Sequence, residues 1–163
     1  GEHAAFFASQ QQGWSWQPTD ASSDALQSTA SWVDFMQLPN LAAPQFLDVT
    51  SEVWPIERAE AVFCANMIHI SPWPCTLGLL RGAARLLREG EALVTYGPYK
   101  VGGQHTAASN AAFDGSLRAR DPSWGVRDVE AIEEAAESRG LTLCERVPMP
   151  ANNACLIFSR QAD

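Results

Sequence analysis

The stretch from residue 61 to residue 99 constrains the fold more than any other part of the chain. Residues 61–70 form a near-continuous apolar run that turns polar toward its end, and residues 92–96 form a second run. An amphipathic segment, residues 71–88, lies between them. A strand buried on both faces loses the polar alternation of a half-exposed strand. The order strand, helix, strand therefore predicts one right-handed crossover unit of a parallel sheet.

The two ends of this predicted helix carry recognisable signals. Ser71 is a suitable N-cap, Pro72 fits the first helical position, and Gly90 fits the position just past the C-terminal cap. In sheets of this kind, ligands bind beyond the carboxyl ends of the strands. The side chains expected at that end are those of Asn66, Met67, His69, Tyr96 and Tyr99.

The rest of the chain alternates between helical and strand patterns. Residues 100–126 are too polar and interrupted for core strands, which predicts a lid-like insertion with one short helix. The last two strands follow each other without a helix, so they pair as an antiparallel hairpin or lie apart. The pattern predicts a single α/β domain over residues 1–163, with a doubly wound, mostly parallel sheet and an antiparallel C-terminal strand pair. Helices are expected over residues 2–12, 22–36, 107–117 and 128–140, and strands over residues 14–17, 45–49, 141–147 and 154–158.

Composition excludes several classes of partner. The net charge of −8, without a basic cluster, argues against duplex nucleic acid. No apolar run approaches the roughly 20 residues of a membrane span. The cysteines lack the paired spacing of a zinc site, so no metal is expected, and three of them stand in apolar runs typical of buried thiols in a reducing, cytoplasmic environment. The four cysteines of the chain are Cys64, Cys75, Cys144 and Cys155.

Two acids close consecutive short strands. An acid after the second strand of a doubly wound sheet can accept both hydroxyls of a ribose, and Asp20 stands at that place. Asp48 and Val49 close the next strand, where a carboxylate can accept an adenine amino group and a backbone N–H can reach a ring nitrogen. Singly, each acid is better explained as a helix cap or turn residue. Together, at consecutive strand ends, they favour a nucleoside site.

A nucleoside site of this kind also needs a glycine-rich turn after its first strand. Only Gly1 stands where such a turn would end, directly before the first predicted helix. We therefore expect the first strand and most of the loop to precede Gly1, so that the chain is a fragment.

Five segments carry distinctive motifs: residues 66–73 (Asn-Met-Ile-His-Ile-Ser-Pro-Trp), 82–87 (Gly-Ala-Ala-Arg-Leu-Leu), 95–99 (Thr-Tyr-Gly-Pro-Tyr), 124–128 (Trp-Gly-Val-Arg-Asp) and 149–153 (Met-Pro-Ala-Asn-Asn). Together they resemble the methyltransferase-like protein 26 family, a group of S-adenosylmethionine-dependent methyltransferase-like proteins. The resemblance covers essentially the whole chain. It implies a class I methyltransferase, Rossmann-like fold and S-adenosylmethionine (SAM) as cofactor.

The resemblance also implies roles by position. Gly1 would be the last loop glycine and Asp20 the ribose acid, while Asp48 and Val49 would address the adenine. Asn66 and Met67 would lie under the methionine part of the cofactor. Family members have a Gly-Ser-Gly-Thr-Gly-type loop just ahead of the position of Gly1, and this chain lacks most of that loop and the strand before it.

The acceptor side offers fewer signals. Methyl transfer is an in-line displacement, so the protein mainly orients and desolvates the acceptor, and a base is needed only for an acceptor proton of high pKa. His69 is the best candidate base, although a structural histidine bonded to a loop carbonyl is slightly favoured. Tyr96 and Tyr99 either line an acceptor pocket or serve as core packing and a surface plug. Trp73 would wall that pocket or staple the helix to the insertion.

The insertion contributes a second group of candidates. Asn110, Arg120, Trp124 and Arg127 would place it over the site. Arg127 and Asp128 are equally explained as a helix cap and a surface ion pair, which is the commoner arrangement. His3 and His105 are expected on the surface.

Three functions remain open from the sequence. The first is an SAM-dependent methyltransferase acting on a small-molecule or undetermined acceptor. The second is a non-catalytic Rossmann-like domain used for protein association. The third is a nicotinamide-dependent oxidoreductase, against which the antiparallel final strand pair counts. The sequence leaves the oligomeric state open, including a homo-oligomer.

Overall fold

The computed structural model describes residues 1–162. Contacts within the chain divide it into two compact units, Gly1–Pro55 and the remainder from Ile56 onward. Each unit has its own helices and its own paired strands, and each is described by itself. The single domain over residues 1–163 stays a prediction.

The first unit pairs two helices with two very short strands. Helix α1 spans Glu2–Gln10 and α2 spans Ser23–Met36, while β1 (Thr19–Asp20) and β2 (Gln45–Phe46) pair in parallel. The Oγ atom of Ser22 accepts a hydrogen bond from the Ala25 N–H and caps α2, which agrees with the helix expected over residues 22–36. The core of this unit consists of Ala5, Ala8 and Leu41, with aromatic and aliphatic side chains packed around them.

The strands of the first unit differ from those predicted. Within residues 14–17 only Trp16 makes a bridge, to Leu41, and the strand proper begins at Thr19. The strand predicted over residues 45–49 ends at Phe46. Strands of two residues leave almost no periodic pattern to detect, so the position of β1 and the length of β2 could not be predicted from the sequence.

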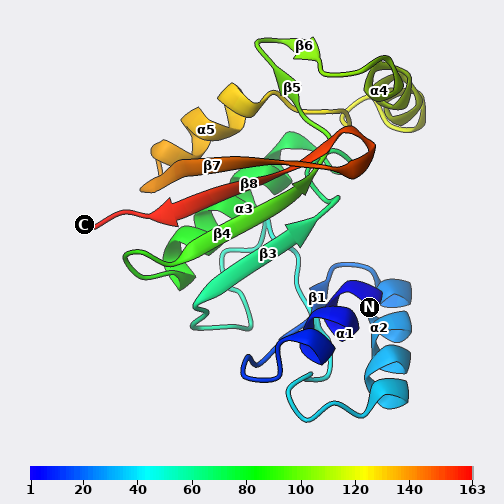
Figure 1. Cartoon of the computed structure of the whole chain (residues 1–163), viewed down its shortest axis with the longest axis vertical. Coiled ribbons are helices and arrows are strands. Elements are labelled where there is room, and N and C mark those ends of the chain that lie inside the picture. Colours follow the sequence, from blue (N-terminus) through cyan, green and yellow to red (C-terminus); the bar gives the residue numbers. More distant parts are fainter. Residues whose placement is uncertain (163) are drawn as a thin grey trace. The chain divides into compact units, whose positions relative to one another are not determined.

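The second unit is built on a mixed four-stranded sheet, shown in Figure 1. Its strands are β3 (Ala61–Ala65), β4 (Ala92–Gly97), β7 (Leu141–Met149) and β8 (Asn153–Arg160), in the order β3-β4-β8-β7. Strands β3 and β4 are parallel, whereas β8 is antiparallel to both β4 and β7. Three strands therefore run in one direction and only β8 runs against them, which confirms the α/β fold with an antiparallel C-terminal pair.

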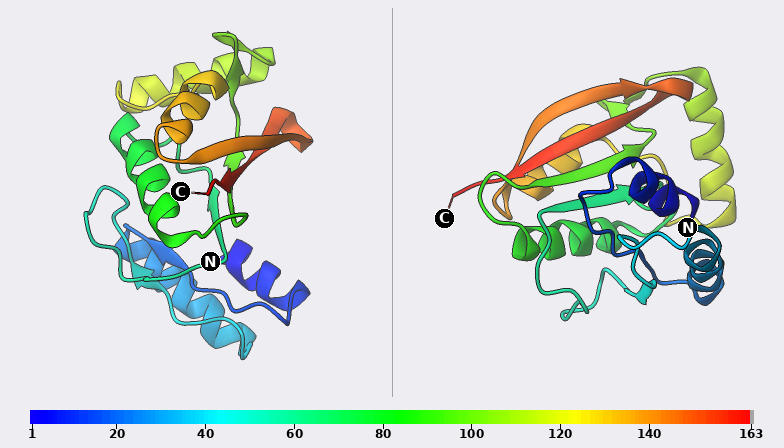
Figure 2. Two further views of the ribbon diagram at one scale, coloured as in Figure 1. Left: turned by 90° about the vertical axis from the view of Figure 1, so that its left-hand side faces the viewer. Right: turned by 60° about the horizontal axis from the view of Figure 1, so that its bottom comes forward.

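Two helices cover one face of this sheet, as Figure 2 shows. They are α3 (Trp73–Leu86) and α5 (Val129–Glu137). Buried side chains from both layers form the core, because alternate strand residues point toward the helices. The fully buried members include Leu80, Leu93, Ile132, Leu156 and Phe158.

The turn into α3 departs from the prediction at both ends. Strand β3 stops at Ala65 because Asn66 adopts a left-handed backbone with φ 60°. Pro72, not Ser71, is the N-cap of α3, and the Ser71 hydroxyl instead donates to the Met67 carbonyl at 2.8 Å. Gly90, with φ 78°, lies in a turn beyond the end of α3 at Leu86 rather than directly at its cap.

The insertion is more structured than expected. It contains a small hairpin of β5 (Lys100–Val101) and β6 (Gln104–His105), which the sequence did not predict. Helix α4 (Ala108–Arg120) confirms the predicted helix and extends three residues beyond its predicted end. At the far edge, β7 and β8 are joined by the short 3-10 helix η1 (Pro150–Asn152).

Candidate functional site

The two predicted nucleoside acids lie at the same edge of the β1–β2 pair. The Leu47 N–H donates to the Asp20 carbonyl at 3.0 Å, which places the residues after both strands side by side. The Asp20 Oδ1 accepts from the Ser22 N–H at 2.8 Å. The Asp48 Oδ1 accepts from the N–H and the hydroxyl of Thr50 at 2.8 and 2.7 Å.

Both acids are therefore turn residues, as the competing interpretation predicted, and both are also exposed at one edge. The hydrogen bonds from the Thr50 hydroxyl and N–H hold the pKa of Asp48 below its usual value, so this group is anionic at neutral pH. Each carboxylate uses only its Oδ1 in these turns and keeps a second oxygen for a ligand.

Two backbone features of the same unit fit a nucleoside. Val49 follows Asp48, and within residues 1–162 its N–H has no hydrogen-bond acceptor. At Gly1, an added Cβ would come within 2.7 Å of the Thr29 Cα and 2.8 Å of the Trp32 Cδ1. Only glycine allows this close approach at the start of α1, as the last glycine of a nucleotide-binding loop does. The residues present therefore fit the adenosine half of SAM.

The turn after β3 brings Asn66 and Met67 to the carboxyl end of that strand. The Asn66 N–H donates to the Tyr96 carbonyl of β4 at 2.8 Å. The Met67 carbonyl accepts from the Ile70 N–H at 3.1 Å and from the Ser71 hydroxyl. Both residues are half-buried at the end predicted for them. A shared cavity with Asp20 and Asp48 stays a prediction, because those acids belong to the other unit.

His69 is held in the layer between the sheet and α4. Only 5% of the residue is exposed, and its ring meets the ring of Phe113 edge-on at 5.5 Å. Burial, aided by the charge of Arg127, lowers its pKa to about 4. The imidazole is therefore neutral at physiological pH and can accept a hydrogen bond or a proton.

The contacts of His69 differ from the predicted bond between its ring and a loop carbonyl. Within the described residues no loop carbonyl bonds its ring nitrogens. Its own carbonyl instead accepts from the Gly125 N–H at 3.0 Å. On the sheet side, a Cβ on Gly97 would stand 3.1 Å from the His69 Nδ1, so the imidazole packs directly on the glycine that ends β4.

Arg127 fixes the turn that carries His69. Its Nη2 donates to the carbonyls of Ser71 and Ser123 at 2.8 and 2.7 Å, and its Nε donates to the Ile68 carbonyl at 3.4 Å. Its guanidinium also lies 5.8 Å from the ring centre of Trp73. Among residues 1–162 Arg127 makes no ion pair with Asp128, whereas Asp128 is the N-cap of α5, so only the cap half of the competing interpretation is confirmed. Trp73 thus packs on a guanidinium that also bonds to Ser123 of the insertion, an arrangement that agrees with the second alternative. A wall of the acceptor pocket stays a prediction.

The remaining candidate residues of the insertion differ in burial and in their hydrogen bonds. Trp124 is half-buried and its backbone N–H donates to the Asp121 carbonyl at 3.0 Å, while Arg120 is exposed. Asn110 is buried, and its side-chain amide donates to the Thr106 hydroxyl at 3.1 Å and to the Asn152 carbonyl at 3.0 Å. Asn110 thus joins α4 to the end of the β7–β8 hairpin.

The centre of the insertion is Asp114, which the sequence analysis missed. It is 6% exposed and accepts from the Val126 N–H at 2.7 Å. Lys100 Nζ, His105 Nε2 and Arg118 Nε lie 3.4, 3.3 and 3.2 Å from its oxygens. The four-residue spacing from Asp114 to Arg118 on a helix was a visible signal.

Asp114 is ionised despite its burial. Desolvation opposes ionisation, but hydrogen bonds from Val126 and Arg118 and the charge of Lys100 outweigh it and hold the pKa below its usual value. His105 is half-buried beside this carboxylate, so its prediction as a surface residue is wrong, whereas His3 is exposed as expected.

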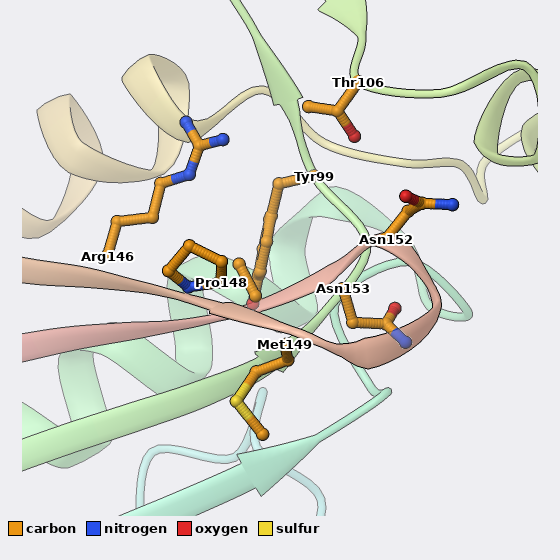
Figure 3. Close-up of a pocket in the computed structure, with 8 residues that line it drawn as sticks. Tyr99, Thr106, Arg146, Pro148, Met149, Asn152 and Asn153 are labelled. Atoms are coloured by element: carbon orange, nitrogen blue, oxygen red, sulfur yellow. The ribbon is translucent and has the colours of Figure 1, made fainter.

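The two tyrosines point to different surroundings. The Tyr96 hydroxyl accepts from the Asn153 side-chain amide at 3.0 Å. The Tyr99 hydroxyl donates to the Thr95 hydroxyl at 2.8 Å, and burial raises its pKa. Tyr99 is 4% exposed, and its ring lines a cavity of about 200 Å³ (Figure 3).

The described residues contain neither a metal-binding cluster nor a membrane-spanning helix. In residues 1–162 no three His, Cys, Asp or Glu side chains gather closely enough to hold a metal ion. No helix of that range combines the length and apolar character needed to cross a membrane. The four cysteines are free thiols, and Cys144 is exposed.

Nearly the whole chain matches one known protein family. Residues 1–160 match the family described as "Protein of unknown function (DUF938)". The chain belongs to this family. Its match covers nearly every residue of both units.

Solved structures share the fold. An O-methyltransferase family 2 protein from Planctomyces limnophilus DSM 3776, described in complex with apigenin, matches with a TM-score of 0.83 and 16% identity over 97% of the chain. The S-adenosylmethionine-dependent methyltransferase SibL matches with a TM-score of 0.79 and 18% identity over 98%. A structure described as a pericyclic reaction enzyme matches with a TM-score of 0.78 and 15% identity, also over 98%.

These likenesses show the fold and not the reaction. The chain spans 46%, 47% and 40% of the three solved chains, so less than half of each is compared. The class I methyltransferase fold predicted from the sequence is confirmed.

Proposed function

We propose that this chain belongs to an SAM-dependent methyltransferase that transfers a methyl group to a small-molecule acceptor. The observation that carries the proposal is the sheet order β3-β4-β8-β7, in which the antiparallel β8 lies between the parallel β4 and β7. The O-methyltransferase and SibL have this fold, and the residues of the first unit fit an adenosine. The finer assignment to the methyltransferase-like protein 26 family rests on the sequence motifs alone.

The first unit would hold the cofactor. The free oxygen of Asp20 would accept from the ribose hydroxyls, and the free oxygen of Asp48 from the adenine amino group. The Val49 N–H, which lacks a protein acceptor, would donate to a ring nitrogen of the adenine. Bound SAM would supply an electrophilic methyl group on its sulfonium.

The second unit would serve the acceptor. Asn66 and Met67 would border the methionine part of the cofactor from the end of β3. His69, neutral at physiological pH, would accept a hydrogen bond or proton from the acceptor hydroxyl or amine. Its depressed pKa makes it a weak base, so its larger contribution would be to orient the acceptor in a site from which water is excluded. Arg127 and Phe113 would hold the imidazole in place.

Calorimetric titration of the protein with SAM tests the cofactor part. We expect saturable binding, weakened about 10-fold or more in Asp20→Asn and in Asp48→Asn, because each change removes a charge-assisted hydrogen bond. Asp34→Asn is the matched control, since Asp34 is an exposed acid of α2 in the same unit. Absence of saturable binding at millimolar SAM would rule the proposal out.

A second function, cofactor binding without methyl transfer, is favoured by one observation. The pericyclic reaction enzyme has the same fold, so the fold accommodates chemistry other than methylation. Incubation with SAM carrying a labelled methyl group and a pool of small hydroxylated and amino compounds separates the two. Label in a product that is lost in His69→Ala supports the methyltransferase, whereas binding without any labelled product supports the alternative.

A further inference from the structure

The cavity beside Tyr99 is not used by the proposed methyl transfer. It is lined by residues of the β7–β8 hairpin, of the turn after β4 and of the start of the insertion, and its volume is about 200 Å³. A pocket for a drug-sized ligand encloses about 300–1,000 Å³, so this cavity suits a molecule with a single ring. Its lining residues are Tyr99, Thr106, Arg146, Pro148, Met149, Asn152, Asn153 and Ala154.

Some polar groups of this lining already have hydrogen-bond partners within the protein, and one charged group has no carboxylate partner. The Asn153 amide donates to the Tyr96 hydroxyl and the Pro150 carbonyl, and the Tyr99 hydroxyl is bonded to Thr95. The guanidinium of Arg146, in contrast, pairs with no carboxylate among residues 1–162. A guanidinium carries five N–H donors in a planar fork, the geometry that matches a carboxylate.

The start of α4 adds to the positive character of this corner. The N-cap of α4 is Ala107, which offers no side-chain hydrogen bond, and the first turn contains no acidic residue. The helix dipole is therefore not compensated there. The first turn contacts the cavity lining, because the Asn152 amide donates to the Ser109 hydroxyl at 3.2 Å.

The apolar part of the lining faces the same space. In Figure 3 the side chains of Arg146, Pro148 and Tyr99 lie on one side of the hairpin, whereas Met149 extends to the other. Register agrees, since Arg146 pairs with Leu156 and Pro148 with Ala154, which are buried on the helix-covered face. A ring placed against Tyr99 and Pro148 would carry its substituent within reach of the guanidinium.

We propose that this cavity binds a small aromatic or other planar carboxylic acid, with Arg146 pairing the carboxylate and Tyr99 and Pro148 packing on the ring. The site lies entirely in the second unit and does not depend on methyl transfer. Because Arg146 is an exposed residue and the ion pair stays partly solvated, we expect a Kd on the order of 1 mM.

Titration of the ¹⁵N-labelled protein with benzoate, followed by NMR, tests this inference. We expect saturable shifts at Arg146 and around Tyr99, at least about 10-fold weaker affinity in Arg146→Gln, and an intermediate loss in Arg146→Lys, which keeps the charge but not the planar fork. Arg88→Gln is the matched control, because Arg88 is an exposed arginine outside the cavity lining. It should bind benzoate as the wild type does.

Three comparison ligands separate the parts of the proposal. Benzamide has the shape of benzoate without its charge, acetate has the carboxylate without the ring, and inorganic phosphate has charge without either. Each should bind at least about 5-fold more weakly than benzoate. The inference is overturned if benzoate does not saturate, if Arg146→Gln binds it unchanged, or if any of the three other ligands binds as tightly.

Discussion

The acids of the two units are held in different ways. In the first unit, Asp20 and Asp48 bond to residues two positions further along the chain and stay exposed. In the second unit, Asp114 is buried and bonds to Val126, twelve positions away, and to side chains from three separate segments. A carboxylate in a local turn stays accessible to a ligand. A buried carboxylate in a long-range network uses its oxygens for bonds that stabilise the fold. The difference separates candidate binding acids from a structural one.

The largest expected effect is on Asp114. Asp114→Asn should lower the free energy of unfolding by about 3 kcal/mol, because it leaves clustered cations without their buried counter-charge. Asp48→Asn, in an exposed local turn, should cost under about 1 kcal/mol. Urea denaturation of both variants checks the contrast, and equal losses would contradict it.

The pH dependence of Asp114 sharpens the same contrast. Its pKa is lowered in the folded state, so the stability it contributes is present above the unfolded pKa of 3.8 and is lost as pH falls through the folded pKa. The gap between wild type and Asp114→Asn should therefore shrink below about pH 4. A stability difference between the two proteins that stays constant down to pH 2 would show that the ionised carboxylate of Asp114 does not stabilise the fold.

The second effect concerns His69. Its pKa falls from 6.5 to about 4 on folding, so below pH 6.5 the unfolded chain binds a proton that the folded chain does not. Stability should decline by about 2–3 kcal/mol between pH 6.5 and 4, and His69→Gln should remove most of this decline. Urea midpoints across that range measure it, and parallel curves for the two proteins would show that His69 is accessible to protons in the fold.

The third effect compares two glycines. A Cβ on Gly97 would press on the His69 ring at 3.1 and 3.2 Å, so Gly97→Ala should cost about 1–2 kcal/mol and displace the imidazole signals in NMR spectra. Gly115 lies in α4 with nothing within 4 Å of an added Cβ. Gly115→Ala should stabilise the protein by about 0.5–1 kcal/mol, and the opposite order of the two variants would contradict the packing described.

The smallest effect distinguishes the two tyrosines. Tyr99→Phe leaves the buried Thr95 hydroxyl without its donor and should cost about 1–2 kcal/mol. Tyr96→Phe removes an acceptor from Asn153, which still bonds the Pro150 carbonyl, and should cost under about 1 kcal/mol. Thermal unfolding of the two variants checks the order, and a larger loss for Tyr96→Phe would contradict it.

Sequence patterns predicted the parts of the fold that rest on local signals. The apolar runs of β3 and β4 and the starts of α2 and α5 are all where they were expected. The end of β3 before Asn66 was missed because Met67, Ile68 and Ile70 continue the apolar run beyond it, although asparagine adopts left-handed backbone more readily than most residues. Strand β1 was misplaced, and β2 begins where predicted but is shorter, because periodicity needs more residues than these strands contain.

The site was less predictable than the fold. The convergence of Asp20 and Asp48 at one edge follows from parallel pairing and was anticipated. The surroundings of Asp114 and Arg146 were not, because their contacts join segments 12 or more residues apart. Such contacts depend on how helices and strands pack against one another, and local sequence patterns do not predict that packing.

The most direct measurement is the SAM affinity of the wild type beside Asp20→Asn, Asp48→Asn and the control Asp34→Asn. We expect saturable binding of SAM by the wild type. Asp20→Asn and Asp48→Asn should each weaken it about 10-fold or more, and Asp34→Asn should leave it within about 2-fold. Equal affinities in all four proteins, or no binding at millimolar SAM, would contradict the central claim that these two strand-end acids hold the adenosine of a methyl donor.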